Sequence, residues 1–237
     1  MSFHENYTEL KTSRFERKFV FANSNVPTVV SYLKLNPGHF NEIYFKRQVN
    51  NIYFDTHNLK NYYDNHMGKS NRSKFRIRWY GDLFTRVEKP ILEIKIKNGL
   101  VGRKLSFLLK PFDVNEQLNM AQLKEILHTS NVPEWVLDEL SMQFPILINS
   151  YSRRYFQSFD RNFRFTVDFN LSFHSFNLVP SLKTTPYMED KTIVLELKYD
   201  DIHDSKSSFI TNQLPLRLNK FSKYVTGIDI INSHLAV

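Results

Sequence analysis

Arginine, lysine and glutamate recur at alternate positions in several short segments of the sequence. Arg76 and Arg78 stand two residues apart, and Glu93 and Lys95 repeat the spacing. Arginine presents a planar fork that fits two phosphate oxygens, and lysine presents a mobile point charge. Carboxylate oxygens beside such cations are ligands that suit Mg²⁺ or Mn²⁺. These residue types favour a site that binds a phosphate-rich anion together with a divalent metal.

The segments that carry these charges alternate between polar and apolar residues, which predicts β-strands with two different faces. In one of them, Arg76 and Arg78 share a face, and Phe75, Ile77 and Trp79 lie opposite. The expected strands cover residues 15–19, 51–56, 74–80, 92–97, 150–157, 163–169 and 193–199. Helices are expected at 27–35, 114–128 and 133–144, where apolar residues follow helical spacing. The predicted class is α+β.

The charged face of the predicted sheet has two interpretations. It could be the solvated side of an ordinary antiparallel sheet. Alternatively, the sheet closes into a barrel, with the helices over its apolar outer face and the charges lining a channel. A closed barrel would also remove exposed strand edges. The alternation by itself does not decide between them.

Composition narrows the class of protein. The chain has 237 residues, and Lys plus Arg number 32 against 24 for Asp plus Glu, which favours an anionic partner. There is no cysteine, so disulfides and thiolate metal sites are excluded. The sequence shows no signal peptide and no apolar run of membrane-spanning length, so we expect a cytoplasmic protein. No Gly-x-x-x-x-Gly-Lys-Ser/Thr motif is present, which excludes a P-loop enzyme.

The order of the motifs resembles the VTC-type polyphosphate polymerase domain, a branch of the triphosphate tunnel (CYTH-like) metalloenzymes. The matching segments are RFERK at 14–18, IYFDT at 52–56, RIRWYG at 76–81, LEIK at 92–95, YSRRYFQ at 151–157, RFTVD at 164–168, LELK at 195–198 and KFSKY at 220–224. They span nearly the whole chain, so we expect a single domain over residues 1–237. One position departs from the wider superfamily, whose opening Glu-x-Glu-x-Lys begins here with Arg14. That change fits the polymerase branch better than the tripolyphosphatase branch.

The resemblance implies a closed antiparallel β-barrel with flanking helices, which threads a polyphosphate chain. It assigns phosphate and nucleotide binding to Lys18, Arg76, Arg78, Lys95, Arg153 and Arg164, and catalysis to Lys198, Lys220, Lys223 and Arg153. It assigns the metal, Mn²⁺ or Mg²⁺, to Glu196, and the residue pattern adds Glu93 as a second metal ligand.

The implied activity is transfer of the terminal phosphate of ATP to inorganic polyphosphate. Two alternatives are hydrolysis of triphosphate or nucleoside triphosphate, and polyphosphate binding without catalysis. A membrane-protein partner could receive the product. Nucleic acid is not an expected partner, because most aromatic residues lie opposite the Arg and Lys residues. Tyr53, Trp79 and Tyr80 are more typical of a core, although they could stack on a base.

Overall fold

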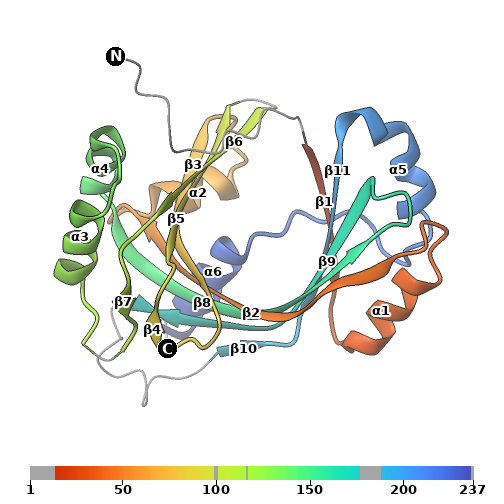
Figure 1. Ribbon diagram of the computed structural model, residues 1–237, viewed down its shortest axis with the longest axis horizontal. Coiled ribbons are helices and arrows are strands. Elements are labelled where there is room, and N and C mark those ends of the chain that lie inside the picture. Colours follow the sequence, from red (N-terminus) through yellow and green to blue (C-terminus); the bar gives the residue numbers. More distant parts are fainter. Residues whose placement is uncertain (1–13, 99–100, 116, 177–187, 236–237) are drawn as a thin grey trace.

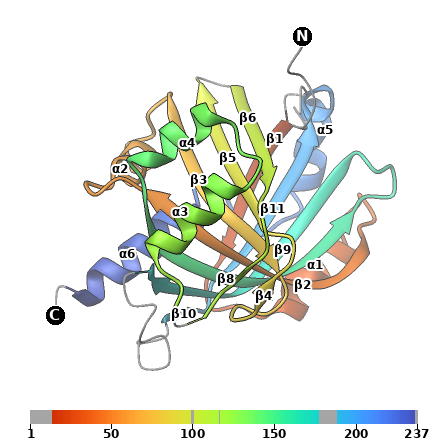
Figure 2. The same ribbon diagram turned by 60° about the vertical axis from the view of Figure 1, so that its left-hand side comes forward.

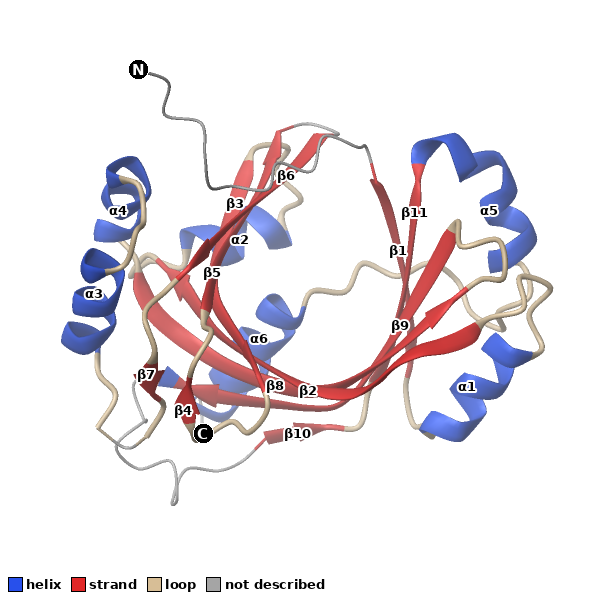
Figure 3. Ribbon diagram, in the orientation of Figure 1, coloured by secondary structure: helices blue, strands red, loops and turns tan. Residues whose placement is uncertain are grey.

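The computed structural model of the protein describes residues 14–98, 101–115, 117–176 and 188–235, and one large antiparallel sheet dominates them (Figures 1 and 3). Its strands follow the order β1-β11-β9-β8-β2-β3-β5-β6, and β10 pairs with β9. Their bounds are β1 Arg14–Phe21, β2 Asn41–Asp55, β3 Arg72–Tyr80, β5 Ile91–Asn98, β6 Val101–Leu108, β8 Phe144–Gln157, β9 Phe163–Ser175, β10 Met188–Asp190 and β11 Ile193–Asp200. A separate small ribbon joins β4 (Arg86–Val87) to β7 (Phe112–Asp113).

The helices are α1 (Val26–Lys34), α2 (Lys60–His66), α3 (Met120–Thr129), α4 (Glu134–Ser141), α5 (Asp204–Thr211) and α6 (Lys223–Leu235). The α+β class and the predicted strands are confirmed, although β2, β8 and β9 extend well beyond the segments expected. The predicted helix at 133–144 ends at Ser141, and Phe144 already begins β8. In the described part of the chain, no helix is long and apolar enough to cross a membrane.

The sheet curls strongly, but its backbone ladder does not close among the described residues, so the predicted closed barrel is not confirmed. The edge strands β1 and β6 share no backbone ladder. Side chains reach across the opening, where Lys95 Nζ of β5 lies 3.2 Å from Glu16 Oε2 of β1. Closure requires strand number, tilt and stagger to agree. The alternation of polar and apolar residues indicates which face of the sheet each residue occupies. It does not indicate strand number, tilt or stagger.

Helices cover the convex face of the sheet, as Figure 2 shows for α3 and α4 in front of β3, β5 and β6. Leu123, Leu127 and Val136 of these helices pack against Ile77 and Leu92, and all of these side chains are buried. On the other wall, α1 and α5 cover the outer side of β1, β9 and β11 in the same way. The apolar side chains of the strands are therefore buried on the convex face of the sheet, and the charged side chains lie on its concave face.

Helix α6 packs against one end of that concave face. Its Tyr224, Ile228 and Ile231 join an apolar cluster with Tyr151 and Phe173 of the sheet. The helix approaches the sheet at Gly227, where a Cβ would lie 2.6 Å from the Phe173 ring and 2.7 Å from a Leu147 methyl group. Apolar packing thus fills one end of the concave face, and none of the described helices covers the charged remainder.

A buried carboxylate, Asp55, fixes α2 and α6 to the end of β2. Its oxygens accept hydrogen bonds from the backbone N–H groups of Asn61 and Tyr62 at the start of α2. The hydroxyl of Tyr224, in the first turn of α6, donates a short hydrogen bond to the same carboxylate. Because Tyr224 directly follows Lys223, this contact also fixes where Lys223 enters the concave face.

We predict that Tyr224→Phe lowers the free energy of unfolding by about 1.5–3 kcal/mol, the usual range for a hydrogen bond to a charged group. Tyr62→Phe is the matched control. It removes a hydrogen bond of 2.5 Å to Asp229 that also joins α2 to α6 but is exposed to solvent. It should change stability by less than about 0.5 kcal/mol. Urea unfolding of both variants measures the difference, and equal losses would contradict the role given to Asp55.

Candidate functional site

The charged concave face, hereafter the inner face, carries two arginines of β3 that share one glutamate. Arg76 Nε donates to Glu93 Oε2 at 2.7 Å, and Arg78 lies farther from the same oxygen, at 3.6 Å. Lys104 of β6 contacts the other oxygen of Glu93. Burial raises the pKa of Glu93, but the cations Arg76, Arg78 and Lys104 outweigh it and lower this pKa below its usual range. Glu93 therefore stays ionised and is engaged by three cations.

Neutral side chains hold Arg78 in a fixed orientation. Its Nε donates to Asn51 Oδ1 at 2.9 Å, and a terminal nitrogen donates to the Tyr151 hydroxyl at 3.2 Å. Its side chain is only 10% exposed. An arginine oriented in this way needs no rearrangement to present its remaining N–H groups to an anion.

On the other side of β2 from β3, Arg153 and Lys223 converge on Asp168. Two nitrogens of Arg153 donate to the two carboxylate oxygens, at 2.5 and 2.7 Å, and Lys223 Nζ lies 2.5 Å from Oδ2. The Asp168 side chain is fully buried. Burial raises its pKa, but Arg153 and Lys223 reverse that effect and lower the pKa below its ordinary value. This carboxylate brings residues from β8, β9 and the start of α6 together.

Strands β1 and β11 contribute a lattice of alternating charges. Lys18 stands directly opposite Glu196, and Glu16 directly opposite Lys198. Lys18 Nζ lies 2.8 Å from Glu16 and 3.8 Å from Glu196, and Lys198 Nζ lies 2.6 Å from Glu196. Burial and the neighbouring Glu196 raise the pKa of Glu16, but Lys18, Lys95 and Lys198 lower it to about 2. The pKa of Glu196 is likewise well below its usual value, because the nearby cations overcome burial.

Lys74 differs from the paired cations described above because, among the described residues, no carboxylate pairs with it. Its Nζ donates to Ser222 Oγ at 2.9 Å, just before α6. Burial and the positive charges of Lys18, Lys95, Arg72 and Arg76 lower its pKa to about 7. An anion bound nearby would relieve this repulsion.

The inner face thus brings together most of the predicted site residues, and the outliers are all at its rim. Arg164 lies directly opposite Lys198 in the ladder and shares its face, but its side chain is exposed. Lys95 of β5 is 60% exposed near the opening between β6 and β1. Lys220 is exposed in the segment before α6. The Arg14 side chain lies outside what the structure describes.

Sequence reasoning did not count Glu16, Lys74, Lys104 or Asp168 among the site residues. Three of these were detectable from strand alternation. Lys74 has the same parity as Arg76, Glu16 the same as Lys18, and Asp168 the same as Arg164. Lys104 required the pairing of β5 with β6, a strand that was not predicted.

Among the described residues, basic side chains outnumber carboxylates on the inner face, and each of its carboxylates, Glu16, Glu93, Asp168 and Glu196, contacts a cation. The surplus positive charge is partly withdrawn from water, so neighbouring cations repel one another more strongly than they would at an open surface. Such a surface is suited to an extended anion with several charges.

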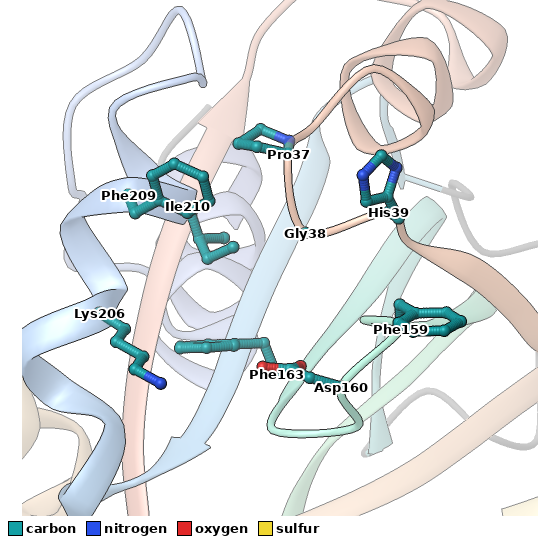
Figure 4. A pocket seen from close by; sticks show the side chains of 9 residues that line it. All are labelled: Pro37, Gly38, His39, Phe159, Asp160, Phe163, Lys206, Phe209 and Ile210. Atoms are coloured by element: carbon teal, nitrogen blue, oxygen red, sulfur yellow. The ribbon is translucent and has the colours of Figure 1, made fainter.

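A second hollow lies on the outer side of the sheet, between the loop after α1, the β8–β9 turn and α5. Figure 4 shows Phe159, Phe163 and Phe209 among its lining residues, with Lys206 at one side. Phe163 has the opposite parity to Arg164, so this hollow is separate from the inner face. Its mostly apolar lining does not suit a phosphate chain.

Comparison with known proteins yields both family and fold. The PH1819 protein of Pyrococcus horikoshii has a similar fold, with a TM-score of 0.50 and 10% identity over 91% of this chain and 99% of that chain. A candidate adenylate cyclase from Vibrio parahaemolyticus has a TM-score of 0.49 and 11% identity, over 91% and 98% of the two chains. No significant match was found among curated protein sequences.

The model of the VTC domain family matches residues 13–232, nearly the whole chain and every strand that carries the inner face. The family predicted from the order of the charged motifs is therefore confirmed, and the protein belongs to the VTC domain family.

Proposed function

We propose that the protein is a metal-dependent polyphosphate polymerase, which transfers the terminal phosphate of ATP to a growing inorganic polyphosphate chain. The proposal rests on the inner face, because oriented arginines and lysines project from it into the same concave space. Two of them, Arg78 and Arg153, are held by buried partners before any ligand arrives. Membership of the VTC domain family supports handling of nucleotide triphosphates and polyphosphate. A cytoplasmic location and a membrane-protein partner remain predictions.

The proposed reaction is a direct phosphoryl transfer. A terminal oxygen of the polyphosphate chain attacks the γ-phosphorus of ATP, and the bond from that phosphorus to the bridging oxygen breaks. ADP leaves with the bridging oxygen and both electrons of the bond. Such a reaction requires little covalent help from a protein and depends on positioning and charge stabilisation. Basic residues on both walls can contact successive phosphates of one chain.

We assign Arg76, Arg78 and Arg153 to the triphosphate, with Lys18, Lys95 and Arg164 along the remaining wall and rim. Lys198 and Lys223 would hold the transferring phosphate, and Lys220 would guide the chain end from its exposed position. In this assignment Lys223 exchanges part of its contact with Asp168 for the phosphate. Arg153 contacts both oxygens of Asp168, so the carboxylate remains neutralised when Lys223 moves.

The carboxylates of the inner face differ in how well they suit the binding of Mn²⁺ or Mg²⁺. Glu196 and Glu16 lie at diagonal positions of the β1–β11 ladder, and both are ionised in the neutral range. Their contacts are to lysines, whose flexible stems let them move to phosphate oxygens. Glu93 suits a metal less well, because three cations already engage it. A divalent ion held by Glu196, with Glu16, would neutralise charge on the bridging phosphate oxygens.

Product analysis tests the proposed function. Purified protein is incubated with γ-labelled ATP and Mn²⁺, and the labelled products are separated by size. ADP together with a ladder of lengthening polyphosphate is the expected result. Orthophosphate as the only labelled product would favour hydrolysis. Binding of ATP without turnover would favour a non-catalytic polyphosphate-binding module.

We predict that Glu196→Gln abolishes metal-dependent turnover while metal-free binding of tripolyphosphate persists or tightens. The substitution keeps the shape of the side chain but removes a negative charge next to Lys18 and Lys198. Glu42→Gln is the control, because Glu42 pairs with Arg154 on an exposed part of the sheet. Unchanged turnover of Glu196→Gln at limiting Mn²⁺ would remove Glu196 from the metal site.

Two adjacent arginines of β8 provide a second test. Arg153 contacts Asp168 on the inner face, whereas Arg154 contacts Glu42 through two nitrogens on the other face. Lysine keeps the charge but not the fork. We predict that Arg153→Lys lowers turnover by roughly 100-fold, the lower end for loss of one oriented donor. Arg154→Lys should retain wild-type turnover, and equal effects in the two variants would argue against a ligand on the inner face.

The lowered pKa of Lys74 predicts that the protein takes up a proton when it binds a triphosphate. With a pKa of about 7, Lys74 is largely neutral at pH 8, and a bound anion would return its pKa toward the ordinary lysine value. Affinity should therefore fall as pH rises above 7, and proton uptake should vanish well below pH 7. Calorimetry of tripolyphosphate binding in two buffers of different ionisation enthalpy measures the uptake. Lys74→Met should remove it, and identical uptake in this variant and the wild type would exclude Lys74.

A further inference from the structure

Three tyrosines surround Arg47 at one end of the charged inner face. The Arg47 guanidinium carbon lies 5.1 Å from the ring centre of Tyr44, 5.5 Å from that of Tyr155 and 5.8 Å from that of Tyr80. The rings of Tyr44 and Tyr155 meet edge to face, with centres 5.6 Å apart. We call Tyr44, Arg47, Tyr80 and Tyr155 the aromatic rim.

An irregularity in β2 creates this cluster. Tyr44 pairs with Tyr155 and Arg47 with Arg153, so three steps along β2 correspond to two steps along β8. In a regular strand, residues three apart would lie on opposite faces. The extra residue places Tyr44 and Arg47 on the same face as Arg153. Bulges of this kind commonly redirect side chains beside functional sites.

The aromatic rim directly continues the arginines assigned to the triphosphate. Tyr80 follows Arg78 by two residues on the same face of β3, and Tyr155 follows Arg153 by two on β8. Two residues span roughly 7 Å along a strand, which leaves room for a ribose between a phosphate and a stacked base. The rim therefore lies where the nucleoside of a nucleotide would be if its phosphates lay on Arg78 and Arg153.

The surfaces available at the aromatic rim suit a flat ring better than another phosphate. Tyr44 and Tyr80 are about half exposed, at 51% and 48%. Among the described residues, no carboxylate pairs with Arg47, whose contacts are to aromatic rings. Tyrosine faces and guanidinium planes stack on nucleobases of any sequence, whereas a phosphate gains nothing from an aromatic face.

We propose that the aromatic rim is the base-binding subsite of the nucleotide substrate. The proposal rests on the proposed function, because it takes the triphosphate to lie on the neighbouring arginines. It gives the protein a means to distinguish a nucleoside triphosphate from inorganic tripolyphosphate or the end of the product chain. The base stacks on Tyr80 and Tyr44, with Arg47 holding the rings in place.

Binding of ATP and of tripolyphosphate, which has three phosphates but no base, tests the proposal by calorimetry. We expect Tyr80→Ala and Tyr44→Ala to weaken ATP binding by about tenfold, a typical effect of losing one stacked aromatic ring. Tripolyphosphate binding by the same variants should remain at the wild-type value, which also verifies their folding. Tyr80→Phe keeps the ring and should bind ATP as the wild type does. Phe45→Ala is the matched control, since Phe45 is next to Tyr44, 97% exposed and outside the rim.

Equal losses for both ligands, or no loss for either, would overturn the base-binding subsite and leave the proposed transfer intact. An ATP-specific loss in a protein that makes no polyphosphate would support the subsite while the proposed polymerase fails. A wild-type protein that binds neither ligand would overturn both proposals.

Discussion

Mutual repulsion among partly buried cations is the constraint on which the rest of this structure depends. A curled sheet presents lysines and arginines from facing walls toward one another, and the free energy of that arrangement is unfavourable without compensation. Carboxylates that lie between the cations provide this compensation. Glu93 lies between Arg76, Arg78 and Lys104, and Asp168 lies between Arg153 and Lys223. Among the described residues no carboxylate pairs with Lys74, and burial together with the remaining repulsion lowers its pKa.

The apolar parts of the structure make this crowding possible. Helices over the convex face bury the phenylalanines and leucines that alternate with the charges, which fixes the face that each charged residue takes. Helix α6 packs on the concave side through Tyr224, Ile228 and a close approach at Gly227. The same helix begins with Lys223, so one packing interaction both fills the apolar end and delivers a cation to Asp168. Asp55, buried beneath it, connects that placement to the end of β2.

The sequence predicted which residues share a face more successfully than it predicted how the sheet is assembled. Alternation placed Arg76 and Arg78 correctly against Phe75 and Ile77, because burial of one face enforces a period of two. It did not detect that β1 and β6 stay apart, because closure depends on tilt and stagger. It also did not detect α6, whose apolar residues contact the inner rather than the outer face. Tyr44 and Arg47 cluster because β2 pairs irregularly with β8. Strict alternation would have placed these two residues on opposite faces of the sheet.

The location of a bound phosphate chain tests the account most directly. A crystal structure of the protein with tripolyphosphate and Mn²⁺ would reveal it. We predict phosphates along the inner face in contact with Arg76, Arg78 and Arg153, with the metal on Glu196. Tripolyphosphate found only on the outer surface, with the inner face still closed by its own ion pairs, would contradict the account.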